Sequence, residues 1–588
     1  MRLKALDPLK DLKDSLAGSI SDAMISRGLE VAPDDVEITD RTKEDFGDLS
    51  TAVALKYASS EGLNPLEVAA DVAGSMDPPD LISEVRPVRG YLNSYIDWSR
   101  FGPMVVEAIL REGGDFGRPG GSPGTLVLEH TSVNPTGPLN IARSRNSIIG
   151  DSLARVFEYM GWRVRRLYLL NDVGHQVVAI YWGRTKGIRS ESLAERYADY
   201  SSKPDFETLF TYVPTMRELS DNPDAEREVA ELESRTHTDH DLLLRLRETS
   251  EECLRGQLET LGRLDIGFDE ITPESRFIEE GRLSDIVSRL GERGVTVEEE
   301  DGSVGLDLSS MGLSRRKSEH LTLLKSDGSS TYTLRDMAYH ELKFREGDLF
   351  ITVLGEDHKR QFAELKAALG ILGHDEDLRA AFYSFVTYQG GGKMSTRQGK
   401  TVPLDRIIDE AITRSEAEVR KRRDGLSPEE VRAIATQVGL GAIKFNVLKV
   451  DTNKSIQFNW EEAIDFEGDS SAYVQYACAR ASSILKNAKG WEPPDDMGMP
   501  TNADERRLIW SLAQAPGVVA RSHADMKPNY LAEHSIQVSS LFNRFYMKHR
   551  VLQVDEPKRS ARLALTMSTK LILETLLGLM GIAAPEEI

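Results

Sequence analysis

Two segments of this chain have the residue types needed to bind the phosphates of a nucleotide. The first is a short apolar strand, expected at Thr125–Glu129, followed by a turn rich in Pro and Gly and by a helix that begins near Asn140. Free backbone N–H groups and the helix dipole at such a start attract anions. The second is a basic, glycine-flanked loop at 393–400, which can bring positive charge to a polyphosphate. Together they predict nucleotide activation chemistry.

Regular elements on both sides of the first segment are expected to hold it at the edge of a sheet. Strand Thr125–Glu129 leads to a helix with one apolar face, which Gly161 should end, and a second apolar strand is expected at Arg163–Leu170. In parallel α/β sheets, ligands bind beyond the carboxyl ends of the strands. Glu129 and Asp172 stand at two such ends, so a site is expected there.

The second segment is expected to follow further strands of the same sheet. Strands at 349–354 and 382–388, with a helix at 360–372 between them, lead the chain to the basic loop. The intervening residues, about 186–320, are rich in charge and carry the scattered leucines of long polar helices. We therefore expect a helical insertion there, within an α/β, Rossmann-like domain.

Length and turn signals predict several domains. A chain of 588 residues is too long for one hydrophobic core. Residues 1–112 predict a small α+β domain, which a linker rich in Gly and Pro separates from the nucleotide-binding domain at 125–402. A helical connector is then expected at 403–464, and an all-α bundle at 465–588.

Composition argues against several classes of protein. With 73 basic and 95 acidic residues the net charge is −22, which disfavours a passive nucleic-acid coat, and the basic clusters at 163–166, 315–317 and 420–423 are equally typical of solvated faces. Cys253 and Cys478 provide neither a disulfide framework nor a zinc spacing, so no metal ligands are predicted. The chain shows neither a bilayer-length apolar run nor a secretory signal at its start, and we expect a cytoplasmic protein without a membrane partner.

Further motifs occur in a fixed order along nearly the whole chain. They are Phe46-Gly47-Asp48, Asn140-Ile141-Ala142-Arg143, Asn171-Asp172-Val173-Gly174-His175-Gln176, Tyr332-Thr333-Leu334-Arg335-Asp336, Lys393-Met394-Ser395-Thr396, Asp465-Phe466-Glu467-Gly468 with Tyr473-Val474-Gln475-Tyr476, and Leu577-Gly578-Leu579-Met580-Gly581-Ile582. In this order they resemble class I aminoacyl-tRNA synthetases, and specifically arginyl-tRNA synthetases of the archaeal type. Several ordered motifs are far more specific than any one alone.

The resemblance implies an activity and a domain plan. The activity is ATP-dependent ligation of L-arginine to tRNA(Arg) through an arginyl-adenylate, with ATP and Mg²⁺ as cofactors and the tRNA required before activation. The plan is a Rossmann-like class I synthetase catalytic domain between an N-terminal α+β domain that binds tRNA and a C-terminal all-α bundle that binds the anticodon. Neither reaction step requires a protein nucleophile, because positioning and charge stabilisation carry most of the rate.

The resemblance also assigns residues to the ATP site. Asn140, Arg143, Lys393 and Ser395 would be catalytic, because they would hold the phosphates and neutralise the leaving pyrophosphate. The other ATP-binding residues would be Pro138, Ala142, Gly355, His358, Met394 and Arg397. Two positions depart from the family pattern: Asn140 replaces a His that donates to phosphate, and Ala142 replaces a Gly against which adenine lies. A working but slower ATP site is therefore expected.

An arginine substrate requires carboxylates that can pair with a planar guanidinium. By the resemblance, Glu129, Tyr332 and Asp336 line that pocket, and Ser132 and Asn134 lie near the α-amino and carboxylate groups. Taken singly, these residues have ordinary explanations. Asp336 could form a surface ion pair with Arg335, and Glu129 could be an ordinary carboxylate at the end of a strand.

Two sets of residues are predicted to contact tRNA. In the first domain these are Asn93 and Tyr95, by the resemblance. In the bundle they are Tyr473, Tyr476 and Arg480: the two tyrosines lie three apart and are expected to share a helix face with Arg480, and aromatic rings can stack on splayed bases. The alternative for the second set is a core face with buried tyrosines.

Two rival functions stay open. The altered Asn140 and Ala142 are compatible with a synthetase-like paralogue that binds tRNA but activates amino acid poorly. A nucleotidyltransferase of the same fold acting on another acid is disfavoured by the long bundle and by the carboxylates Glu129 and Asp336. The oligomeric state is not predicted, although a monomer is favoured.

Overall fold

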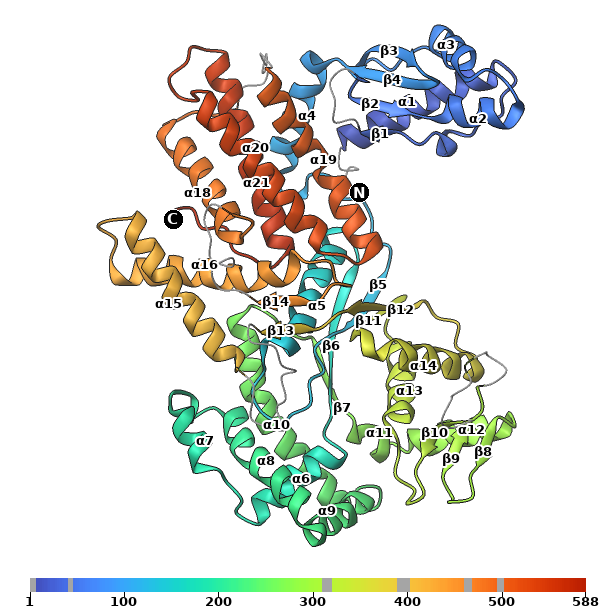
Figure 1. Ribbon diagram of the computed structural model, residues 1–588, viewed down its shortest axis with the longest axis vertical. Coiled ribbons are helices and arrows are strands. Elements are labelled where there is room, and N and C mark those ends of the chain that lie inside the picture. Colours follow the sequence, from blue (N-terminus) through green and yellow to red (C-terminus); the bar gives the residue numbers. More distant parts are fainter. Residues whose placement is uncertain are drawn as a thin grey trace.

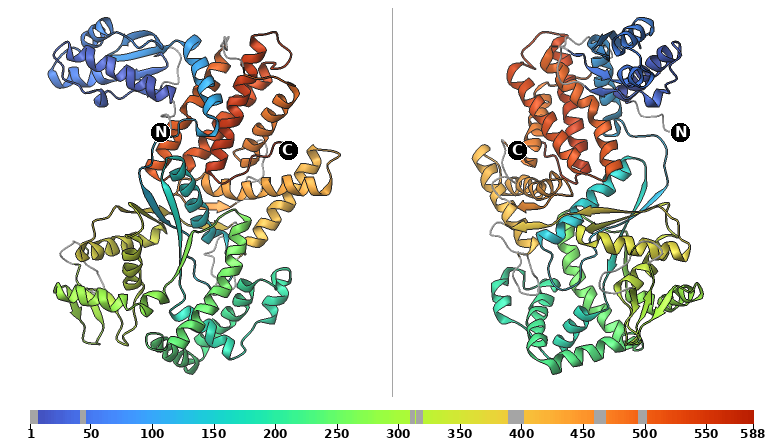
Figure 2. Two further views of the ribbon diagram at one scale, coloured as in Figure 1. Left: turned by 180° about the vertical axis from the view of Figure 1, so that it is seen from behind. Right: turned by 45° about the vertical axis from the view of Figure 1, so that its right-hand side comes forward.

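The computed structural model describes residues 7–40, 46–308, 313, 320–388, 402–458, 468–493 and 502–588. A five-stranded parallel sheet lies at its centre, with a helical bundle on one side and two further lobes on the other (Figures 1 and 2). In spatial order its strands are β12 (Leu378–Tyr383), β11 (Leu349–Gly355), β5 (Thr125–Glu129), β6 (Arg163–Leu170) and β7 (Glu270–Pro273). The expected strands at 125–129, 163–170 and 349–354 are confirmed, and the apolar residues of β5 and β11 suit a sheet covered on both faces.

Side chains of the central strand alternate between two cores. Leu126 and Leu128 pack in the same core as α5 (Ile141–Tyr159), whereas Val127 packs with residues of α13 (Tyr332–Lys343) and α14 (Lys359–Leu372). Helix α5 ends before Gly161, whose φ of +92° suits glycine, as expected. The chain leaves β5 toward β6 and later returns on its other side as β11. The sheet therefore has its topological switch point between β5 and β11, where α/β proteins bind ligands.

The N-terminal unit is an antiparallel sheet covered by helices. Its strands are, in order, β1 (Thr39–Asp40), β2 (Leu49–Thr51), β4 (Tyr91–Ile96) and β3 (Ile82–Val88), and its helices are α1 (Pro8–Ile25), α2 (Val53–Glu61) and α3 (Pro65–Ser75). Helix α4 (Trp98–Glu112) then leaves this unit and packs on the C-terminal bundle (Figure 1). Asp48 stabilises the exit, because its Oδ1 accepts from Trp98 Nε1 at 3.3 Å.

The expected helical insertion at 186–320 is corrected in its second half, because the residues after Arg263 form strands as well as two helices. Up to that point it comprises α7 (Glu191–Arg196), α8 (Pro204–Asp221), α9 (Pro223–Arg235) and α10 (His240–Arg263), which follow α6 (His175–Thr185). The chain then adds β7 to the central sheet, and after α11 (Ser275–Glu279) and α12 (Arg282–Glu292) forms a small sheet from β8 (Thr296–Glu298), β9 (Val304–Leu306) and β10 (Leu321–Leu324). These strands are three or four residues long, which is too short for a clear alternating pattern.

The single strand expected at 382–388 is also wrong, because the structure divides it. β12 ends at Tyr383, and β13 (Val386–Tyr388) pairs in parallel with β14 (Ile456–Phe458) instead of joining the central sheet. At the break, Ser384 N donates to Thr452 O at 2.8 Å, and its carbonyl oxygen accepts from Arg145 Nη1. Long-range bonds to these backbone groups, which leave no local pattern, bend the chain here.

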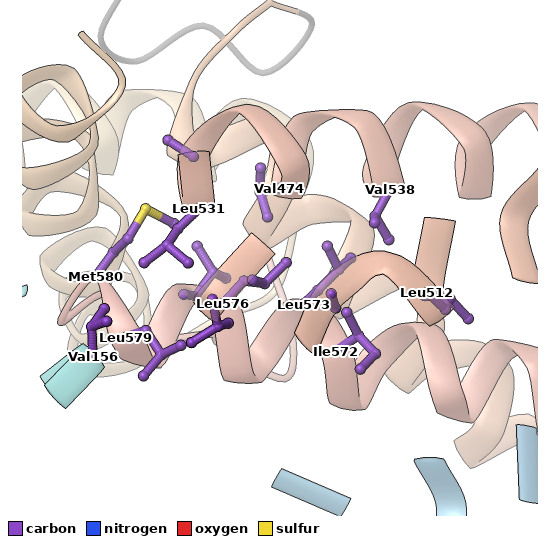
Figure 3. Close-up of a cluster of buried hydrophobic side chains, with 14 of the residues drawn as sticks. Val156, Val474, Leu512, Leu531, Val538, Ile572, Leu573, Leu576, Leu579 and Met580 are labelled. Atoms are coloured by element: carbon purple, nitrogen blue, oxygen red, sulfur yellow. The ribbon is translucent and has the colours of Figure 1, made fainter. Parts of the chain in front are cut away.

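The C-terminal half is helical, as expected apart from β14. It comprises α15 (Leu404–Arg422), α16 (Pro428–Leu448), α18 (Ser471–Asn487), α19 (Ala503–Asp525), α20 (Asn529–Lys548) and α21 (Lys558–Leu579). Buried aliphatic side chains such as Val474, Val538 and Leu573 form its core, and Leu579 and Met580 at the end of α21 lie near Val156 of α5 (Figure 3). Within the described residues, no helix combines the length and apolarity that crossing a bilayer would require.

Candidate active site

The turn that leaves β5 is held in a fixed conformation. Thr131 and Ser132 have positive φ angles of 72° and 42°, an unfavourable conformation for side-chain-bearing residues. Thr131 N donates to Asn146 Oδ1 at 2.7 Å, and Asn146 Nδ2 donates to Val353 O at 2.8 Å. The turn, α5 and β11 are thus tied together at the switch point, which favours a precisely shaped site.

Asn140 is the N-cap of α5. Its Oδ1 accepts from the backbone N of Arg143 at 3.0 Å, and the side chain is buried. Its Nδ2 donates to no partner among the described residues, so that donor is left for a ligand. The neighbouring Pro138 is buried and Ala142 is half-buried.

Arg143 presents a buried guanidinium whose Nη1 has no hydrogen-bond partner in the described part of the chain. Burial lowers the pKa of Arg143 from its ordinary value. A buried donor of a charged group is costly when unpaired, and an anion bound at the start of α5 would remove that cost. This is the arrangement that a phosphate requires.

The predicted catalytic loop, with Lys393, Met394, Ser395 and Arg397, lies outside the described residues. The chain after it runs beside the capped turn: Leu404 N donates to Leu139 O at 2.7 Å. On the other side of the switch point, Gly355 ends β11 and His358 follows in a short 3₁₀ turn. A Cβ at Gly355 would stand 2.5 Å from Asp357 Oδ1, so a larger residue here would displace the Asp357 side chain.

Glu129, at the carboxyl end of β5, is buried and carries two hydrogen bonds. Its Oε1 accepts from Ser132 Oγ at 3.1 Å and its Oε2 accepts from Lys343 Nζ at 2.8 Å. Ser132 Oγ also accepts from Leu169 N at 3.0 Å. Glu129 is therefore not a plain strand-end carboxylate, since it is oriented from both sides.

Tyr332 and Asp336 lie one turn apart on α13. Tyr332 is 51% exposed, and its hydroxyl lies near Gly174, at the start of α6. Burial alone would raise the pKa of Asp336, but the nearby His340 and Lys343 lower it below its ordinary value. The surface ion pair of Asp336 with Arg335 is wrong: Arg335 Nε donates to Glu274 Oε2 at 2.9 Å.

Asn134 lies between two amide side chains. Its Nδ2 donates to Gln176 Oε1 at 2.9 Å, and its Oδ1 accepts from Asn171 Nδ2 at 3.4 Å. Asp172, by contrast, is engaged with Ser275, whose backbone N donates to Asp172 Oδ1 at 2.8 Å. Asp172 therefore holds the end of β6 in place, and the amides beside it are the groups left for a ligand.

His340 and Lys343 are site residues that the sequence reasoning missed. They follow Asp336 by four and seven positions, which places all three on one face of α13. That spacing was available in the sequence. The contact of Lys343 with Glu129 was not, because the two residues are 214 positions apart.

The two residues predicted to bind tRNA in the N-terminal unit differ in accessibility. Asn93 is 2% exposed and its Oδ1 accepts from Ser50 Oγ at 2.8 Å, so its side chain joins β2 to β4 and the expectation of a direct tRNA contact is wrong. Tyr95 is half-buried beneath Arg86, whose guanidinium lies 4.5 Å from the ring centre. Of this pair, Tyr95 remains a candidate.

In the bundle, Tyr476 and Arg480 line a cavity of about 730 Å³. The Arg480 guanidinium lies 4.7 Å from the ring centre of Tyr476 and 5.1 Å from that of Tyr546, which the sequence reasoning missed. Arg423, Lys486 and Lys570 also line this cavity. Tyr473, one turn before Tyr476, is half-buried. Arg423 and Lys486 are both paired with Glu587, and Lys570 is paired with Glu574, so these charges are largely neutralised within the bundle. The two rings beside the Arg480 guanidinium form a surface on which unpaired bases can stack.

Comparisons with known proteins agree with this architecture. Three family profiles match in order: "Arginyl tRNA synthetase N terminal domain" over 10–96, "tRNA synthetases class I (R), catalytic domain" over 105–460, and "DALR anticodon binding domain" over 474–588. Arginine–tRNA ligases of Methanocella arvoryzae and Haloarcula marismortui are 36% and 35% identical, over 94% and 98% of this chain and 96% and 98% of theirs. Both are archaeal, as the resemblance implied.

Among solved structures, the Thermus thermophilus arginyl-tRNA synthetase superposes with a TM-score of 0.80 at 26% identity, covering 98% of this chain and 100% of its own. The parallel sheet with its switch-point site and the appended helical bundle thus define a class I aminoacyl-tRNA synthetase. Profiles and relatives span nearly all of the sequence. The chain belongs to the arginyl-tRNA synthetase family.

Proposed function

We propose that the arginine–tRNA ligase reaction of this family takes place at the carboxyl edge of the central sheet, with ATP at the start of α5 and arginine between β5 and α13. The observation that carries this assignment is that one sheet edge combines two features: the half-buried Arg143 at a capped helix start, whose buried Nη1 lacks a partner among the described residues, and two oriented carboxylates, Glu129 and Asp336. One end suits a polyphosphate and the other suits a guanidinium.

The first step joins the two substrates. The arginine carboxylate attacks the α-phosphate of ATP, the α–β phosphoanhydride bond breaks, and pyrophosphate leaves with its electron pair. Asn140 Nδ2 and the Arg143 guanidinium donate to phosphate oxygens as charge develops. Lys393 and Ser395 would act on the leaving group, with Met394, Arg397, Gly355 and His358 completing the nucleotide site.

The pocket holds arginine at three points. Glu129 and Asp336 pair with the guanidinium, Tyr332 covers it, and Ser132 and Asn134 orient the α-amino and carboxylate groups. In the second step the terminal ribose hydroxyl of tRNA attacks the acyl carbon and AMP leaves. Holding the substrates in line supplies most of the rate for both steps.

tRNA would bind through Tyr95 in the N-terminal unit and, in the bundle, through Tyr473 and the cavity lined by Tyr476, Arg480 and Tyr546. We further infer that arginine activation needs the bound tRNA. A direct contact between the bundle and α5 favours this: Ser152 Oγ donates to Leu579 O at 3.0 Å. A change in the bundle on binding tRNA would thus be felt by the helix that starts at Asn140.

Three further properties belong to the proposal. Mg²⁺ would enter bound to the ATP phosphates, because the described residues contain no group of three or more His, Cys, Asp or Glu side chains able to hold a metal. The enzyme would act as a monomer, since both substrate sites and both tRNA surfaces lie on one chain. It would act in the cytoplasm.

ATP–pyrophosphate exchange tests this function. With arginine and cognate tRNA the exchange should be robust, whereas lysine, citrulline or omission of tRNA should abolish it. Robust exchange without RNA would contradict the tRNA requirement. Tight tRNA binding without exchange under any condition would favour the rival function of a tRNA-binding paralogue, for which Asn140 and Ala142 are the motive.

A further inference from the structure

Two basic side chains join the carboxylates of the proposed arginine pocket. Lys343 Nζ donates to Glu129 Oε2 at 2.8 Å and lies 2.9 Å from His340 Nε2. His340 Nδ1 lies 3.2 Å from Asp336 Oδ1 and 2.8 Å from the Asp336 carbonyl oxygen. Glu129 ends β5 whereas the other three belong to α13, so this hydrogen-bond chain links two separate elements.

The chemistry of the groups fixes the direction of each hydrogen bond. An ammonium can only donate, so His340 must accept through Nε2 and carry its proton on Nδ1. Nδ1–H then donates to Asp336. A doubly protonated imidazole would set two donors against each other at the Lys343 contact. The hydrogen-bond chain therefore runs from Lys343 to Glu129 in one direction and through neutral His340 to Asp336 in the other.

His340 and Lys343 are buried behind Asp336, the more exposed of the two carboxylates. The side chains of His340 and Lys343 are 1% and 2% exposed, against 29% for Asp336. Lys343 Nζ also lies 4.6 Å from the ring centre of Tyr339, a further contact that holds it in place. His340 and Lys343 act on arginine only through the carboxylates, and Lys343 is the one cation that the described contacts place between them.

The charges give this arrangement a consequence for specificity. Glu129, Asp336 and Lys343 together leave one net negative charge, which one guanidinium neutralises. Without Lys343, the buried Glu129 carboxylate would lose its cationic partner and the hydrogen bond that orients its Oε2. A carboxylate that is no longer held in one orientation pairs less well with a planar guanidinium.

We propose that Lys343 and His340 are positioning residues that hold both carboxylates, Glu129 and Asp336, in the orientation that arginine requires. The inference rests on the proposed function, since it takes Glu129 and Asp336 as the guanidinium partners. It adds the two residues through which the pocket obtains its charge and geometry.

A double-mutant cycle on the Michaelis constant for arginine tests this inference in the full-length enzyme with cognate tRNA. Glu129→Gln and Lys343→Met should each raise this constant about 10- to 100-fold, the loss of one charge-assisted hydrogen bond. The double variant should be no worse than the poorer single variant, because both changes remove the same contact between Lys343 and the Glu129 carboxylate. The Michaelis constant for ATP should stay within about twofold.

Lys444→Met is the matched control, because Lys444 is a buried lysine whose Nζ donates to Gly581 O at 2.6 Å, away from the pocket. It should lower thermal stability without a selective effect on arginine. If Lys343→Met does not fold, His340→Leu interrupts the same chain and should raise the arginine constant while sparing ATP.

The outcomes separate this inference from the proposed function. An arginine constant that rises with Glu129→Gln but not with Lys343→Met would overturn the role of Lys343 alone. Fully multiplicative effects in the double variant would also overturn it, because the two residues would then act independently. No change with Glu129→Gln would overturn the pocket itself, and the inference with it.

Discussion

Asn140 caps α5 by accepting the backbone N–H of Arg143 at 3.0 Å, so the two residues expected to bind ATP are also joined to each other. A single amide therefore has two tasks. Its oxygen stabilises the helix start, which is worth about 1 kcal/mol, and its nitrogen remains available to a phosphate. These tasks can be separated by mutation.

Asn140→Asp keeps the cap and removes the donor. Because Asp caps helices as well as Asn, the free energy of unfolding should change by less than about 0.5 kcal/mol. The new carboxylate repels phosphate and competes for Arg143, so ATP binding should weaken by about 2 kcal/mol. Steady-state kinetics at varied ATP measure this effect.

Asn222→Asp is the control for that change, because Asn222 caps α9 in the same way at an exposed position. The Michaelis constant of the Asn222→Asp enzyme for ATP should equal that of the parent. Equal constants for all three enzymes would mean that Asn140 serves α5 alone and makes no contact with ATP.

Tyr546→Ala tests the cavity in the bundle. Tyr546 is 43% exposed beside Arg480, so its removal should cost little folding stability but should weaken tRNA use by about 1–3 kcal/mol if a base stacks there. Aminoacylation at varied tRNA concentrations gives the measurement. Tyr530→Ala is the control. Tyr530 also belongs to α20, and its ring centre lies 3.9 Å from the guanidinium carbon of Arg521 on α19, so its removal should leave tRNA use intact. The same loss in both variants would argue against a specific site.

Asp205 should make stability depend on pH. It is fully buried, and burial raises its pKa to about 7, with Asp405 nearby acting in the same direction. Between about pH 4 and pH 7 the folded state therefore holds a proton that the unfolded chain has lost. Because of Asp205, the free energy of unfolding falls as pH rises through this window, and above the window Asp205 adds no further pH dependence.

Asp205→Asn should remove this dependence, because the amide does not titrate. Between pH 5 and pH 7.5, the free energy of unfolding should fall by on the order of 1–2 kcal/mol more in the parent than in the variant. Chemical denaturation at both pH values provides the comparison. Parallel pH profiles for parent and variant would show that Asp205 is ionised throughout.

The sequence predicted those parts of the fold that local patterns determine. The apolar run 125–129, the helix ended by Gly161 and the strand at 163–170 are all present, because each depends on residues within one element. The break at Ser384 and the pairing of β13 with β14 were missed, because both depend on backbone contacts with residues far along the chain.

The same distinction between local patterns and long-range contacts applies to the residues of the candidate site. Motif order located Glu129, Arg143 and Asp336, but nothing local indicated that Lys343 would pair with Glu129. Asn140 is a different case: a residue type that favours N-caps stood immediately before the helix, so its capping role could have been anticipated. Asn93 was assigned by the resemblance alone, and its burial was not evident from the sequence, because β4 is covered at Leu92, Asn93 and Ser94 in succession.

The arginine pocket is most directly tested by Asp336→Asn. The amide retains an oxygen that can accept from His340, so the fold should survive, but the charge that pairs with the guanidinium is lost. Pyrophosphate exchange with tRNA present should show the Michaelis constant for arginine raised by on the order of 30-fold or more, equivalent to about 2 kcal/mol. The constant for ATP should stay within about twofold of the parent. Equal changes in the two constants, or no change in either, would contradict the assignment of this edge of the sheet to arginine.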